Sequence, residues 1–177
     1  ETAQIQHQRL VLDPADNPWF LIKFNVGAVT GVQIEVGLSD PKADEALPGV
    51  TDVDTPTVGN GATDIACLHM DTDQTLTTVE LVGDGTTGAA ALSSAPSLTT
   101  RAYTPTASTY QTWLVGCRPN LSYALIFNGD GQVGSFATAN GPDSGVLVRP
   151  YALFRTRNTA SKTVNIDYMF YGWERNG

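Results

Sequence analysis

The sequence predicts an all-β protein in which two antiparallel sheets pack face to face as a jelly-roll sandwich. Almost no window of the 177-residue chain places apolar residues at the spacing of an amphipathic helix. Short segments that alternate apolar and polar residues recur instead, and 17 glycines and 10 prolines favour turns between them. The length is enough for one core and marginal for two, so we expect a single domain over residues 1–177.

The N-terminal part of the chain contains three predicted strands and a long loop. A weak strand over residues 4–12 ends in a turn rich in Asp, Asn and Pro at 13–18. Strands over 19–26 and 32–38 alternate, so every second side chain is expected to face the core. Residues 39–61 form a polar loop of a length that is usually functional or mobile.

The rest of the chain supplies the remaining strands. They are predicted over residues 64–71, 75–82, 110–118, 121–127, 132–137, 146–157 and 162–173. Residues 83–108, rich in Gly, Ala, Ser and Thr, are expected to be irregular. The tight-turn signal Asn128-Gly129-Asp130-Gly131 joins two of these strands. We expect the last two strands to be neighbours, joined by a polar turn at 158–161.

The charge of the chain excludes some partners. Its formal net charge is −8, which argues against binding to nucleic acid or to an anionic membrane surface. No apolar run is long enough to cross a bilayer, so membrane insertion is not expected. Residues 146–177 differ from the acidic remainder, because they hold five basic and two acidic residues.

The basic C-terminal region suggests a docking face for a partner protein. Alternation in the strand over 146–157 places a tyrosine and three arginines on one side: Arg149, Tyr151, Arg155 and Arg157. Arg and Tyr are favoured at interfaces, so an acidic surface on a partner subunit could bind here. The alternative is that these arginines pair with Asp167 or Glu174 on the neighbouring strand.

The two cysteines, Cys67 and Cys117, have no metal-ligand spacing. If the strands over 64–71, 75–82 and 110–118 are successive neighbours, one strand separates the two cysteines. Their Cα atoms would then be about 10 Å apart, because strands are spaced by about 4.8 Å. That distance exceeds the reach of a disulfide, so we predict free, buried thiols.

Carboxylates and a histidine at two-residue spacing are the nearest approach to catalytic motifs. The pairs are Asp71 with Asp73, Asp52 with Asp54, and Cys67 with His69. Asp commonly caps turns, and if an Asp pair has a further role, a loop Ca²⁺ site is favoured over catalysis. Cys67 and His69 could form a thiol–imidazole pair, but packing within a sheet is the favoured interpretation. We therefore expect no enzymatic activity and no cofactor.

Three stretches resemble a known family. They are residues 19–24 leading into Val36-Gly37-Leu38-Ser39-Asp40, residues 121–129, and the close over 148–168. In them the chain resembles concanavalin A-like (laminin-G-like) jelly-roll domains of tailed-bacteriophage structural proteins. The resemblance follows the order of elements over most of the chain.

The resemblance implies a bacteriophage virion structural protein, displayed on the particle surface. The first hypothesis is a capsid decoration, cementing or head-fibre protein that contacts capsid or other virion proteins and forms a homo-oligomer, with a trimer as one possibility. The alternative is a carbohydrate-binding, receptor-binding module of a tail fibre or baseplate, which would contact a host-surface glycan. Its candidate sugar-facing aromatics are Tyr103, Tyr110, Trp113 and Tyr171.

The chain departs from two groups that share this fold. The pattern of loop carboxylates and Asn that holds Ca²⁺ in lectins is not matched. Glycoside hydrolases of this fold carry two Glu residues on one strand, whereas no two glutamates share a predicted strand here: Glu1, Glu35, Glu45, Glu80 and Glu174. A secreted hydrolase is therefore the weakest hypothesis.

Overall fold

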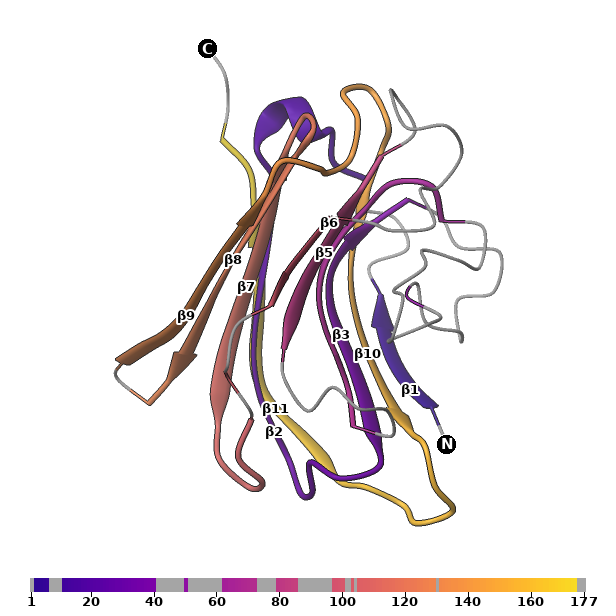
Figure 1. Ribbon diagram of the computed structural model, residues 1–177, viewed down its shortest axis with the longest axis vertical. Coiled ribbons are helices and arrows are strands. Elements are labelled where there is room, and N and C mark those ends of the chain that lie inside the picture. Colours follow the sequence, from indigo (N-terminus) through magenta and orange to yellow (C-terminus); the bar gives the residue numbers. More distant parts are fainter. Residues whose placement is uncertain are drawn as a thin grey trace.

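The computed structural model describes residues 2–6, 11–40, 50, 62–72, 79–85, 97–100, 103, 105–129 and 131–174. Within them two antiparallel sheets face each other, as Figure 1 shows. The six-stranded sheet has the order β1 (Thr2–Gln6), β10 (Arg149–Thr156), β3 (Val32–Ser39), β4 (Ile65–Asp71), β5 (Glu80–Asp84) and β6 (Ser97–Thr100). The five-stranded sheet has the order β11 (Val164–Gly172), β2 (Trp19–Val26), β7 (Gln111–Arg118), β8 (Leu121–Asn128) and β9 (Gly131–Thr138). The predicted jelly-roll sandwich is confirmed.

The only helix among the described residues is the short 3-10 helix η1 (Pro14–Asp16), in the predicted turn before β2. Asp13 caps it by accepting a hydrogen bond from the Ala15 N–H at 2.9 Å. No helix in the described part of the chain is long and apolar enough to cross a membrane.

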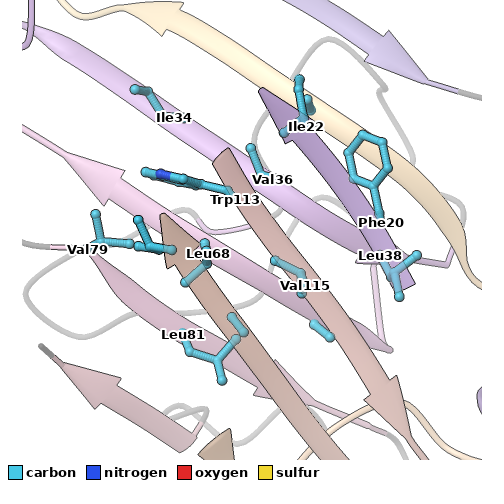
Figure 2. Packing of buried hydrophobic residues seen from close by; sticks show 14 of the residues in the cluster. Phe20, Ile22, Ile34, Val36, Leu38, Leu68, Val79, Leu81, Trp113 and Val115 are labelled. Atoms are coloured by element: carbon cyan, nitrogen blue, oxygen red, sulfur yellow. The ribbon is translucent and has the colours of Figure 1, made fainter. Parts of the chain in front are cut away.

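The core lies between the sheets and is built by alternation (Figure 2). Inward-facing side chains of β2, β3 and β7 supply much of it, including Ile22, Phe24, Ile34, Val36 and Trp113. The rings of Phe24 and Trp113 meet edge to face at a centroid distance of 5.2 Å. The indole N–H of Trp113 donates to Gln111 Oε1 at 2.7 Å, so this buried polar atom is satisfied.

The chain passes from one sheet to the other several times along its length, and this corrects two expectations. β10 and β11 were predicted to be neighbours, but β10 lies in the six-stranded sheet and β11 in the five-stranded sheet. The predicted meander is also wrong, since β7 does not follow β5 within one sheet. Alternation shows which residues face the core, but it does not show which sheet a strand joins.

Cys67 and Cys117 are free and buried, as predicted. The reason differs from the predicted one, because the two cysteines belong to opposite sheets and not to one meander. Burial raises the pKa of Cys117 to about 12. The thiol therefore stays protonated and unreactive in the folded protein.

Candidate functional site

The outer face of the six-stranded sheet carries a row of buried polar residues on three adjacent strands. Glu35 of β3 pairs in register with His69 of β4, and His69 pairs with Glu80 of β5. We call these three residues the polar row. Their exposed fractions are 0%, 0% and 2%, although they point away from the main core.

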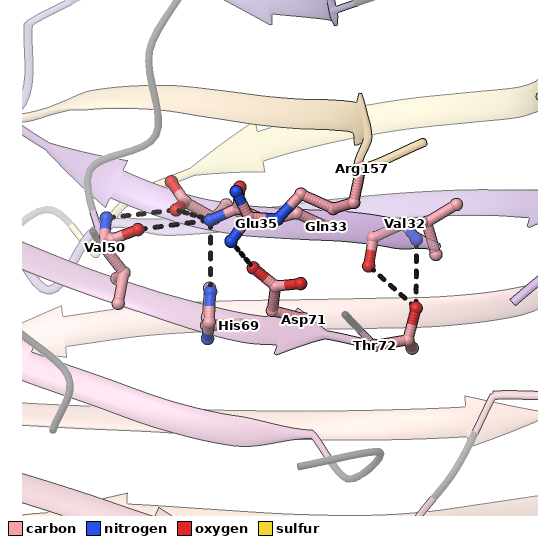
Figure 3. A network of polar contacts seen from close by, with 8 residues as sticks. All are labelled: Val32, Gln33, Glu35, Val50, His69, Asp71, Thr72 and Arg157. Carbon is pink, nitrogen blue, oxygen red and sulfur yellow. Dashed lines mark hydrogen bonds and ion pairs between the residues drawn. The ribbon is translucent and has the colours of Figure 1, made fainter. Parts of the chain in front are cut away.

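Hydrogen bonds connect the polar row and the adjacent Gln33 to Val50, which is distant in the sequence (Figure 3). The Val50 N–H donates to Glu35 Oε1 at 3.0 Å, and Gln33 Nε2 donates to the Val50 carbonyl at 3.1 Å. The Tyr151 hydroxyl donates to Glu35 Oε2 at 3.2 Å. Two residues beyond His69 in β4, the buried Asp71 forms an ion pair with Arg157.

A second apolar cluster covers this face, and its members are Val50, Ala62, Ile65, Cys67, Val82, Tyr151 and Leu153. The pKa of His69 is lowered to about 4, chiefly by burial. Asp71 opposes this shift, and Arg157 contributes to it. The imidazole is therefore neutral at neutral pH. Cys67 and His69 share this covered face, as alternation predicted.

Glu35 and Glu80 are a carboxylate pair that sequence reasoning missed. They lie two strands apart on one face, which places their Cα atoms about 10 Å apart. Glycoside hydrolases use carboxylates at comparable separations. Here, however, both residues are buried, and the Glu35 oxygens already accept bonds from Val50 and Tyr151. This arrangement holds Val50 on the sheet.

The predicted docking face is covered at its centre. Tyr151 is only 1% exposed, because its ring belongs to the second apolar cluster and its hydroxyl bonds to Glu35. This corrects the expectation that Tyr151 is available to a partner. Arg149, Arg155 and Arg157 are half-buried, and Arg157 is paired with Asp71 and not with Asp167 or Glu174.

Four carboxylates gather at one end of the six-stranded sheet: Asp40, Asp64, Asp84 and Asp143. Their oxygens mainly accept bonds from N–H and O–H groups, such as the Asp143 N–H to Asp64 at 2.8 Å and the Gly85 N–H to Asp84 at 2.9 Å. Burial raises the pKa values of Asp40 and Asp84, and the neighbouring carboxylates add to both shifts. Among the described residues, no group of three or more His, Cys, Asp or Glu side chains is arranged to hold a metal ion.

The predicted Asp pairs lie wholly or partly outside the described residues. Asp71 pairs with Arg157, whereas Asp52, Asp54 and Asp73 lie outside the described residues.

The outer face of the five-stranded sheet differs, because it presents aromatic rings to solvent. Four residues lie in register across four adjacent strands: Gly172 of β11, Trp19 of β2, Gly116 of β7 and Tyr123 of β8. We call these four residues the ring row. The Trp19 indole lies over Gly172, where an added Cβ would come within 2.5 Å of the ring. The Tyr123 ring occupies the corresponding space over Gly116.

A polar margin borders the ring row on one side, and it consists of Asn17, Arg118 and Glu174. Arg118 follows Gly116 by two residues in β7, whereas Asn17 and Glu174 lie just outside β2 and β11. The corresponding position of β8 is the apolar Leu121, which pairs with Arg118 and is 36% exposed. Asn17 Nδ2 donates to Glu174 Oε2 at 2.7 Å. Asn17 also has a left-handed backbone with φ of 49°, a conformation that Asn tolerates better than most residues.

The other side of the ring row is apolar. Phe170, Leu21, Leu114 and Leu125 form the next row across β11, β2, β7 and β8. Phe170 is 57% exposed and Trp173 is 51% exposed, both on or next to the edge strand β11. Leu21, Leu114 and Leu125 are half-buried, so the row is partly accessible and its most exposed ring is that of Phe170.

The predicted sugar-facing aromatics are dispersed in the structure. Trp113 is fully buried in the core, which corrects its placement on a sugar-facing surface. Tyr103 is half-buried and donates its hydroxyl to Gln111 at 3.3 Å. Tyr110 and Tyr171 are each 41% exposed, but neither belongs to the ring row. Whether they contact sugar stays a prediction.

Trp19 and Tyr123 were not recognised from the sequence. The available signal was a glycine within each neighbouring strand, because an interior strand glycine often marks a close approach by another group. Gly116 lies within β7, and Gly172 is the last residue of β11.

Comparisons with solved structures place the fold among lectin-like sandwiches. A legume lectin-like domain from Entamoeba histolytica matches with a TM-score of 0.59 and 11% identity, over 99% of this chain and 80% of that chain. The lumenal domain of VIP36, bound to Ca²⁺ and Man3GlcNAc, matches with a TM-score of 0.61 and 11% identity, over 100% and 75%. The CBM2 module of the evolved Dit of Lactobacillus casei BL23 phage J-1 matches with a TM-score of 0.50 and 12% identity, over 97% and 67%.

At these identities the similarity shows the fold alone, and that fold is the concanavalin A-like sandwich expected from the resemblance. No protein-family model matches the chain, and no curated protein sequence matches it.

Proposed function

We propose that this protein is a non-enzymatic glycan-binding module and that the ring row is its sugar-binding surface. The observation that carries this proposal is the placement of Trp19 and Tyr123, each resting on a strand glycine. A pyranose ring has apolar C–H faces and polar edges. Its face can pack on these aromatic rings, while Asn17, Arg118 and Glu174 offer hydrogen-bonding groups beside them.

The structural neighbours support this assignment. VIP36 was solved with mannose-containing glycans, and the phage neighbour is a carbohydrate-binding module of a Dit protein. We further propose that the protein is carried on the surface of a bacteriophage particle, where it binds a glycan of the host surface. The phage neighbour supports that setting, as does the resemblance of residues 148–168 to the ending of such domains in tailed-bacteriophage structural proteins.

The test is a glycan array followed by titration of the best ligand, with tryptophan fluorescence as the readout. Trp19→Ala should weaken binding by about tenfold or more, the loss expected when one stacking ring is removed. Tyr110→Ala is the matched control, since it removes an exposed aromatic ring outside the ring row and should leave affinity unchanged. Binding that is insensitive to Trp19, or no binding across the array, would contradict the proposal.

A second candidate function is assembly with other virion proteins, as a decoration or head-fibre protein. The observation that favours it is the apolar edge strand β11, where Tyr168, Met169, Phe170 and Tyr171 are all at least 37% exposed. Large exposed aromatic side chains are enriched in protein interfaces. Met169→Asp should then abolish incorporation into particles while leaving glycan affinity intact, because Met169 alternates to the opposite side of β11 from the ring row. Loss of glycan affinity without loss of incorporation would favour the glycan-binding role alone.

A further inference from the structure

The two aromatic rings of the ring row have fixed positions above different strands. Gly172 and Gly116 both pair with Trp19, one on each side of β2. The rings therefore lie above strands two spacings apart, a separation of about 10 Å. We infer that the ligand is a linear chain of equatorially linked (β-1,4) pyranose sugars that runs across the strands. This inference rests on the proposed glycan-binding function and narrows it to one class of glycan.

The shape of such a chain fits the spacing of the rings. In a flat β-1,4-linked chain each sugar advances by close to one strand spacing, which is about 4.8 Å. The first and third sugars of a trisaccharide then cover the Tyr123 and Trp19 rings, and the middle sugar lies over the space between them. An α-1,4-linked chain curves out of a plane, so it covers one ring at a time.

The polar margin suits the edges of this chain. Equatorial hydroxyls point outward in the plane of each sugar, toward groups beside the rings. Asn17 and Glu174 are held together by their 2.7 Å hydrogen bond, and the exposed Arg118 offers several N–H donors. One positive and one negative group give this margin no net charge, so it favours a neutral sugar chain.

The opposite border adds apolar surface without further polar groups. Leu21 and Leu114 lie next to the ring row on β2 and β7 and are half-buried. A sugar chain that follows the rings therefore has hydrogen-bonding partners along one edge only. This asymmetry sets the direction of the chain across the sheet and keeps it over the rings.

The experiment is calorimetric titration of the full chain with cello- and chito-oligosaccharides, from monosaccharide to hexasaccharide. The malto-oligosaccharide series, which is α-1,4-linked, is the control for shape. Affinity should rise about tenfold between the disaccharide and the trisaccharide, where the second ring is first reached, and change little beyond that. The malto series should show no such step. The cello and chito series together report whether an acetamido group is required.

Variants then test whether the rise in affinity between disaccharide and trisaccharide depends on the two rings. Tyr123→Ala and Trp19→Ala should each erase the step and leave only weak binding. Tyr168→Ala removes an exposed aromatic ring on the same outer face, in a different row, and should preserve the step. Thermal unfolding of each variant shows whether a lost step accompanies a lost fold, and Tyr123→Leu provides a second, more conservative removal of the ring.

The possible outcomes separate the two claims. Ring-dependent binding that is equal for disaccharide and trisaccharide, or equal for α- and β-linked chains, overturns the linear-chain inference and leaves the glycan-binding function standing. If no sugar binds in a ring-dependent way, the proposed function fails and this inference fails with it.

Discussion

The two outer faces of the sandwich use their outward-pointing side chains in opposite ways. On the six-stranded sheet, Glu35 and His69 point outward, yet both are 0% exposed. On the five-stranded sheet, Phe170 points outward and is 57% exposed, and the Trp19 ring rests on Gly172. Polar groups are therefore buried on one face, and large apolar groups are open to solvent on the other.

Each face reverses the usual distribution, and both reversals are informative. Buried polar residues and large exposed apolar patches are the two departures from the usual distribution that indicate a specific role. On the covered face, the Val50 N–H donates to Glu35 and the Val50 carbonyl accepts from Gln33, and these bonds hold Val50 on the sheet. On the open face, the described residues leave the rings available to a ligand. We propose that the first arrangement serves stability and the second serves binding, and this contrast can be tested.

Glu35→Ala should have the largest effect on stability. The change removes a buried carboxylate and leaves the Val50 N–H and the Tyr151 hydroxyl without their acceptor. Each buried donor left unpaired costs roughly 1–3 kcal/mol, so we expect a loss of about 4 kcal/mol in the free energy of unfolding. Urea denaturation measures this loss.

The matched control is Phe170→Ala on the open face, where the side chain is 57% exposed. An exposed side chain contributes little to the core, so the expected loss is below about 1 kcal/mol. Equal losses for the two variants would mean that the covered network does not stabilise the fold, and the contrast between the faces would fail.

The next effect is a loss of stability in acid that depends on His69. Its pKa is lowered from 6.5 to about 4 in the folded state. Between these values the unfolded chain binds a proton that the folded chain does not, so the free energy of unfolding falls as pH decreases. Near pH 4 the loss from this group is about 3 kcal/mol.

This effect is measured as the difference between the wild type and His69→Gln in urea denaturation at several pH values. Asp40 and Asp84 act in the opposite direction, because their raised pKa values favour the folded state as pH falls. Both carboxylates are present in both proteins, so they cancel in the difference. If the two proteins lose stability in parallel between pH 6.5 and pH 4, His69 is not the group responsible.

Most strands were predictable because alternation and turn chemistry are local, but β6 (Ser97–Thr100) lies in the segment over 83–108 that was expected to be irregular. The segment Trp19–Val26 and the hairpin of β7 and β8 were identified from the residues themselves. The sheet that each strand joins was not, since β10 and β11 follow each other in the chain but lie in opposite sheets. That choice depends on contacts between distant segments, which one sequence does not encode locally.

The site was harder to predict for two physical reasons. In β7, Trp113 and Leu114 point to opposite faces and both are apolar, so hydrophobicity could not decide which of them faces the core. The polar row depends on the register of three strands, which brings Glu35, His69 and Glu80 into line only after folding. A search for paired glutamates within one strand could not find it.

Gly172→Ala should affect binding more than stability. The new Cβ would lie within 2.5 Å of the Trp19 indole, so the ring must move away from its position over Gly172. The ring is a side chain that can rotate, and alanine restricts the unfolded chain, so we expect a stability change below about 1 kcal/mol. Glycan affinity should fall about tenfold, as measured by titration.

Gly131→Ala is the matched control, because an added Cβ there meets its nearest atom only at 4.0 Å. It should change neither stability nor affinity. If Gly172→Ala keeps full affinity, the position of Trp19 over Gly172 is not needed for binding, and the open face must act in another way.

The smallest effect is expected for Lys23→Met on the open face. The Lys23 ammonium pairs with Asp167 at 2.7 Å and lies 5.3 Å and 5.4 Å from the ring centroids of Tyr110 and Tyr168. Solvent screens such exposed pairs, so thermal unfolding should show no change beyond experimental error. A drop of several degrees in the unfolding temperature would mean that this face also stabilises the fold. The two faces would then differ only in how much each contributes to stability.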